Sequence, residues 1–152
     1  MNASIQSYPA ITKPSGLLRV APVLCRLPLL IVAVVFTLIS LRFLLNPVHA
    51  AAVAGISFTS PAGITAAKTA FVAFPLSFAM IAFASLLSSR RLLPGLYALF
   101  TTVAVGTTIR ILSLLTDHSG KESGRLLGPE FVLLVLFVIA IRLESSRAAL
   151  SS

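Results

Sequence analysis

Five charged residues stand out because they lie in or beside long apolar stretches: Arg42, Lys68, Arg110, Asp117 and Glu130. Glu130 is the only acidic residue inside one of these stretches. A carboxylate in apolar surroundings is costly, so Glu130 should either take up a proton or pair with a cation. Arg110 is the first choice of partner, because a guanidinium can donate two parallel hydrogen bonds to one carboxylate.

The other three charged residues could extend this pair into a polar pocket. Asp117 follows Arg110 by two helical turns, which places both on nearly the same helix face. Arg42 and Lys68 come from other segments but are expected near the same level. Cations outnumber acids in this set, which favours an anionic ligand such as a lipid headgroup. The alternative is structural: the Arg110–Glu130 pair joins two helices, and the other two cations extend to the headgroups.

Residues for other chemistries are scarce. His49 and His118 are the only histidines, and no motif of a serine hydrolase, zinc protease or nucleotide-binding loop occurs. The single cysteine, Cys25, excludes an intramolecular disulfide and a cysteine metal cluster. The net charge of +8 comes from scattered cations, without the basic patch typical of nucleic-acid binding. We expect no catalytic residue, no cofactor or metal, and no nucleic-acid partner.

Four apolar stretches must position the charged residues: 28–45, 69–87, 92–115 and 126–141. At about 1.5 Å of rise per residue, each is long enough, or nearly so, to cross roughly 30 Å of hydrocarbon as a helix. Hydrophobic residues make up 57% and charged residues 11% of the 152-residue chain, and the mean hydropathy is +1.02. A soluble domain would carry about 25% charged residues. The sequence therefore predicts an all-α integral membrane protein, an antiparallel bundle of four transmembrane helices.

The expected organisation is one four-span domain, 27–143, between a basic, proline-containing cytoplasmic tail, 1–26, and a C-terminal cytoplasmic tail, 144–152. An alternative is that the N-terminal part is a signal peptide cleaved after Ala50. The length of the first apolar run and the presence of Arg42 within it argue against cleavage.

Prolines mark the expected ends and bends of the helices. Asn46-Pro47 should end the first span, and Ser60-Pro61 has the pattern of a helix N-cap followed by a first-turn proline. Pro75 lies near the middle of the second span, where it leaves the carbonyl of Phe71 without its usual partner and bends the helix. A hydroxyl such as that of Ser77 can compensate for this loss.

The distribution of Lys and Arg predicts the orientation of the spans, because cytoplasmic segments of membrane proteins are enriched in cations. The N-terminal tail, the second connector and the C-terminus hold most of them: Lys13, Arg19, Arg26, Arg90, Arg91, Arg142 and Arg147. Both termini should therefore be cytoplasmic. Counted upward from Arg142, Glu130 should then lie roughly 10 Å below the outer surface of the hydrocarbon.

Several of these features together resemble a family of small four-span bacterial membrane proteins, catalogued as domain of unknown function 4345. The similar positions are Asn46-Pro47, the stretch 60–63, Lys68, the stretch 110–117 and Glu130. The chain departs from the family after Lys68, where relatives tend to have a tyrosine-glycine-glycine-like turn. The resemblance implies four transmembrane helices in a bacterial inner membrane and no particular activity. A more distant likeness to DoxX-type proteins rests on architecture alone.

Two functional hypotheses follow from the sequence. The leading one is a non-catalytic accessory or structural membrane component, with membrane lipids, a second copy of the chain or a larger membrane complex as partners. The alternative is a protein that binds, transports or processes a small anionic molecule or lipid headgroup in the polar pocket near the outer face.

Overall fold

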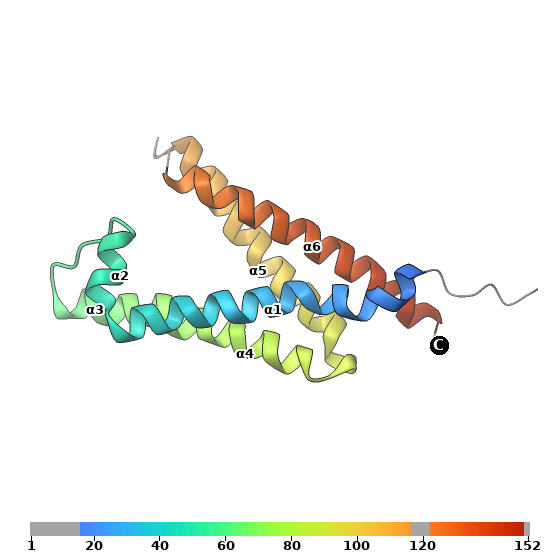
Figure 1. Ribbon diagram of the computed structural model, residues 1–152. Coiled ribbons are helices and arrows are strands. Elements are labelled where there is room, and N and C mark those ends of the chain that lie inside the picture. The colour runs from blue at the N-terminus through green and yellow to red at the C-terminus, as the bar shows by residue number, and fades with distance from the viewer. Residues whose placement is uncertain (1–15, 117–121, 151–152) are drawn as a thin grey trace, which may run out of the picture.

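The computed structural model describes residues 16–116 and 122–150, and every regular element in these two ranges is helical (Figure 1). The elements in chain order are α1 (Gly16–Leu45), α2 (Pro47–Val53), α3 (Pro61–Lys68), the π-helical turn η1 (Thr69–Ala73), α4 (Phe74–Leu86), α5 (Ser89–Thr116) and α6 (Glu122–Leu150). The predicted all-α class is confirmed for the described residues.

Within these ranges, three helical stretches are long and apolar enough to cross a membrane: Pro22–Leu45, Pro61–Leu86 and Ser89–Thr116. The second of them begins earlier than predicted, because α3, η1 and α4 follow one another without a break.

The N-terminal end of the first long helix and the C-terminal end of the last one also differ from the expected boundaries. Helix α1 already begins at Gly16, inside the segment expected as a tail, and α6 continues to Leu150 instead of ending near 141. The α1 extension packs against α6, because Cys25 of α1 is fully buried and its Sγ lies 3.6 Å from the carbonyl oxygen of Ala140 in α6. Tertiary contact of this kind stabilises a helix beyond its apolar stretch.

The long helices pack as two pairs. Helix α1 lies along α4, and α5 lies along α6, with the helices of each pair running in opposite directions (Figure 1). The pairs contact each other through α1 and α6 and through α4 and α5. They lie close together near the turn between α4 and α5 and diverge toward the C-terminal end of α5, so that they form an open V (Figure 1).

The main core lies where the two pairs meet. Its largest fully buried side chains come from three helices: Leu29, Leu96, Leu99 and Phe137. Phe100 contacts Phe137 edge-on, with ring centroids 6.4 Å apart. Small residues let the backbones approach, and Ala33, Ala82 and Ala140 are buried in the same core. This packing holds the two helix pairs together at the vertex of the V. The two pairs, which form its arms, diverge from there.

The irregular backbone before Pro75, which forms the π-helical turn η1, is stabilised from its own helix and from a neighbouring helix. The hydroxyl of Ser77 donates to the carbonyl of Ala73, 2.8 Å away in its own helix. A contact from α1 is added, because the Ser40 hydroxyl lies 2.8 Å from the Phe36 carbonyl and 3.2 Å from the Val72 carbonyl of η1. Ser40 is only 2% exposed. A hydroxyl of the neighbouring helix therefore stabilises the irregular backbone, as is usual where membrane helices are interrupted.

Two short helices form the connector between α1 and η1. Asn46 and Ser60 cap α2 and α3, with side-chain oxygens that accept hydrogen bonds from the backbone N–H groups of His49 (3.2 Å) and Gly63 (3.3 Å). The predicted Ser60-Pro61 helix start is thus confirmed. Phe43 of α1 stacks on Phe71 of η1, with ring centroids 4.5 Å apart, and holds the connector to the end of the α1–α4 pair.

Candidate functional site

Arg110 and Glu130 form the predicted ion pair. The Nε of Arg110 donates a hydrogen bond to Oε1 of Glu130 over 2.9 Å. Arg110 lies near the C-terminal end of α5 and Glu130 directly after Pro129 in α6, so the pair joins the two helices of one arm of the V. Because the two residues are twenty positions apart in sequence, only the antiparallel packing of α5 on α6 brings them together.

The second oxygen of the carboxylate has no hydrogen-bond donor among the described residues. Glu130 Oε2 is buried, although the Glu130 side chain as a whole is 24% exposed. A buried acceptor without a donor costs about 1–3 kcal/mol. A molecule beside the pair could contact the exposed part of the Glu130 side chain rather than this buried oxygen.

A cavity of about 510 Å³ lies beside the pair, between α1, α5 and α6. Its walls are almost entirely apolar, and the residues lining it are Ile31, Val32, Val35, Phe36, Ile39, Thr102, Val103, Gly106, Thr107, Arg110, Pro129, Glu130 and Leu133. Its volume is in the usual range of small-molecule sites. Its lining residues come from α1 on one side and from α5 and α6 on the other, so the cavity lies between α1 and the α5–α6 arm.

The ion pair lies at one end of this cavity. Arg110, Gly106 and Thr102 follow one another at single-turn spacing along α5, so the lining of α5 extends about 12 Å from the pair toward the vertex. The hydroxyls of Thr102 and Thr107 donate within their own helix, to Ala98 (3.0 Å) and Val103 (2.9 Å). Among the described lining residues, the pair thus supplies the polar groups that remain available.

Part of the cavity lining on α1 reaches the protein surface. Val35 and Ile39 of α1 line it and are 43% and 36% exposed, so their side chains lie at its mouth. Gly106 faces open space, since an added Cβ atom would meet no atom within 4 Å. A long apolar molecule could therefore enter between α1 and α5 without displacing side chains.

Of the four candidate site residues that the structure describes, it brings together two, Arg110 and Glu130. Arg42 is exposed in the last turn of α1, Lys68 is exposed in the last turn of α3, and neither lines the cavity. Both belong to the α1–α4 arm, which diverges from the arm that carries the Arg110–Glu130 pair (Figure 1). Asp117 lies outside the described residues.

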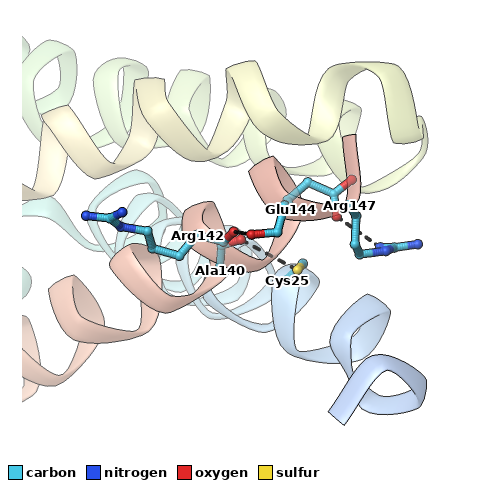
Figure 2. A network of polar contacts seen from close by, with 6 residues as sticks. Cys25, Ala140, Arg142, Glu144 and Arg147 are labelled. Atoms are coloured by element: carbon cyan, nitrogen blue, oxygen red, sulfur yellow. Dashed lines mark hydrogen bonds and ion pairs between the residues drawn. The ribbon is translucent and has the colours of Figure 1, made fainter. Parts of the chain in front are cut away.

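A second ion pair, which the sequence analysis did not single out, lies at the other end of α6 (Figure 2). Arg147 Nη1 donates to Glu144 Oε2 over 2.9 Å, and the Glu144 side chain is only 13% exposed. The i,i+3 spacing is the signal that could have revealed this pair, but the segment was expected to be a tail. Figure 2 shows it next to Cys25 of α1, which places the pair at the α1–α6 contact.

The chemistry available at the cavity is that of binding. An ion pair at one end and apolar walls elsewhere suit an amphipathic molecule. Among the described residues, no three His, Cys, Asp or Glu side chains gather in a way that could hold a metal ion.

Comparisons with known proteins give no match to this chain, whether with protein-family models, with curated proteins or with solved structures. The resemblance to the four-span bacterial family stays a prediction.

Proposed function

We propose that the chain is a four-span integral membrane protein that binds a small amphipathic molecule between α1, α5 and α6. One observation carries this proposal: the apolar cavity of about 510 Å³ ends at the Arg110–Glu130 pair, and both charged side chains line it. An ion pair that served only to join α5 and α6 would not need the cavity. The protein acts by binding, without a catalytic residue.

The proposed fourth span is the apolar part of α6, 126–141, which completes an antiparallel four-helix arrangement. Large apolar side chains are exposed along the long helices, as expected for surfaces in contact with lipid; examples are Leu38, Phe74, Met80, Val105 and Val135. The excess of Lys and Arg at both termini and in the α4–α5 turn supports cytoplasmic termini in a bacterial inner membrane.

A non-catalytic accessory role in a larger membrane complex, or a homo-oligomer, is the second candidate. It is favoured by the exposure of apolar side chains on α4, where Phe74 is 60% and Met80 is 64% exposed. These positions could contact helices of a partner as well as lipid. In that case the Arg110–Glu130 pair would serve mainly to hold α5 against α6.

Native mass spectrometry of the detergent-extracted protein tests the binding proposal. The informative variant is Gly106→Leu, because Gly106 lines the cavity on α5, has open space around an added Cβ atom and is not part of the ion pair. Gly128→Leu is the matched control, because Gly128 also faces open space but does not line the cavity.

We expect the unmodified protein and Gly128→Leu to retain a small molecule that Gly106→Leu loses. Equal retention by all three would contradict binding in the cavity. A bound partner protein or a stable oligomer without a small molecule would favour the accessory role.

A further inference from the structure

We infer that the occupant of the cavity is a phospholipid whose head carries a primary ammonium group, with the ammonium on Glu130 and the phosphate on Arg110. This inference rests on the proposed function and specifies its ligand. It follows from three features of the site: the charge at the end of the cavity, the hydrogen-bonding groups that are still free there, and the direction in which the apolar walls extend.

The charge at the end of the cavity does not favour a simple anion. The excess of cations in the sequence came from Arg42 and Lys68, and neither of them lines the cavity. The described charged groups that do line it are one guanidinium and one carboxylate, which sum to zero. A zwitterionic head, which carries one charge of each sign, complements this pair.

The hydrogen-bonding groups point to the same chemistry. Glu130 lines the cavity with a side chain that is 24% exposed, and the described donor to its carboxylate is Arg110 Nε. An ionised carboxylate has room for more than one donor, so it can accept a further hydrogen bond from an N–H or O–H group of a ligand. Arg110 uses Nε for Glu130, and its terminal Nη groups donate to no described residue. The ligand should therefore present a strong donor next to a strong acceptor. An ammonium joined through two carbons to a phosphate has this arrangement.

The size and shape of the cavity suit part of one acyl chain of such a lipid. From the ion pair, apolar lining extends down α5 to Val103 and down α6 to Leu133, on the side toward the vertex of the V. An acyl chain attached to a head at the pair would follow these walls. The mouth at Val35 and Ile39 opens between the helices, which allows a lipid to enter from the bilayer rather than from water.

The carboxylate of Glu130 also predicts how the site selects among headgroups. A primary ammonium offers three N–H donors, and each N-methylation removes one of them while the positive charge remains. A trimethylated head has no donor for the carboxylate. A glycerol head brings hydroxyl donors but no positive charge beside the carboxylate. The site should therefore prefer the primary ammonium over both.

The test uses the unmodified full chain in detergent with four lipids that share the same acyl chains. These are phosphatidylethanolamine, its N-methyl and N,N-dimethyl derivatives, and phosphatidylcholine, supplied in equal amounts and scored by native mass spectrometry. We expect the amount of bound lipid to fall with each methyl group. The difference between phosphatidylethanolamine and phosphatidylcholine should be roughly tenfold, which is the effect of one hydrogen bond to a charged group. Phosphatidylglycerol with the same chains is a further competitor and should bind less than phosphatidylethanolamine.

Three substitutions test whether the headgroup preference arises in this cavity. Glu130→Gln should reduce the preference for phosphatidylethanolamine over phosphatidylcholine while keeping lipid bound, because the apolar walls are unchanged. Gly106→Leu should lower binding of every lipid, and Gly128→Leu should match the unmodified protein. If Glu130→Gln does not fold, the methylation series on the unmodified protein still decides the question.

The remaining outcomes separate the inference from the proposed function. Equal binding of all headgroups, lowered by Gly106→Leu, would overturn the ammonium inference and leave binding in the cavity intact. A preference for phosphatidylglycerol would also overturn the inference and favour an anionic ligand. Binding that Gly106→Leu does not change would overturn both the inference and the proposed function.

Discussion

Gly95 of α5 packs directly against the side chain of Ser85 in α4. A Cβ atom at position 95 would collide with the Ser85 hydroxyl and lie 2.5 Å from its Cβ atom. Both residues are buried, and the Ser85 hydroxyl donates to the Ile81 carbonyl of its own helix over 2.7 Å. This close approach of α4 to α5 lies beside the turn between them, and therefore near the vertex of the V on which the cavity depends.

Replacing Gly95 should destabilise the protein. Gly95→Ala adds a methyl group where no space exists, and overpacking of this kind costs about 1–3 kcal/mol. We expect a lower melting temperature in detergent, followed by light scattering or intrinsic fluorescence.

Gly106→Ala is the control for this substitution, since its added Cβ atom meets open space in the same helix. It should be neutral or slightly stabilising, because alanine favours a helix over glycine. A Gly95→Ala protein as stable as Gly106→Ala would contradict the close packing of α4 on α5.

Breaking the ion pair from one side should cost more than removing it entirely. Arg110→Ala leaves both oxygens of Glu130 without a donor in a site that is only 24% exposed, a loss of about 1–3 kcal/mol. Arg110→Leu combined with Glu130→Leu removes both charges and should recover part of that loss. Melting temperatures of the single and double variants measure the difference. A double variant that is less stable than Arg110→Ala would contradict this prediction, because it would show that the ion pair contributes more to stability than two apolar side chains do.

The hydroxyl of Ser40 should contribute to the packing of α1 on η1. Ser40→Ala removes the contact with the Val72 carbonyl and should lower stability by about 1 kcal/mol. Ser77→Ala is the matched control, because the Ser77 hydroxyl is exposed and bonds only within its own helix. Equal effects of the two substitutions on the melting temperature would argue against a special role for Ser40.

The proposed orientation places the α2–α3 connector outside and the α4–α5 turn inside the cell. In a Cys25→Ala background, an impermeant maleimide should label Ser57→Cys in intact cells and label Ser89→Cys only after permeabilisation. Both positions are exposed. Labelling of both under the same condition would place them on the same side of the membrane and contradict the four-span topology.

The sequence was sufficient to predict the helical class and the Arg110–Glu130 pair. A single acid in an apolar helix restricts its partners to the few cations at a similar level, and helical rise gives that level directly. The Ser60-Pro61 cap was equally predictable, because a cap is a local interaction within one turn.

The divergence of the two helix pairs could not be predicted in the same way. It depends on contacts between residues far apart in sequence, such as Cys25 with Ala140 and Ser40 with Val72. Arg42 and Arg110 have similar predicted levels, but they belong to different arms of the V. The predicted depth of two residues in the membrane gives no information on how far apart their helices lie at that depth. For the same reason, the apolar cavity between α1, α5 and α6 has no counterpart in the sequence pattern.

A crystal structure grown in a lipidic mesophase containing phosphatidylethanolamine would test binding in the cavity most directly. The account predicts continuous elongated density that begins at Arg110 and Glu130 and follows α5 toward Val103. An empty cavity, or α1 closed against α5 and α6 with no space between them, would contradict it.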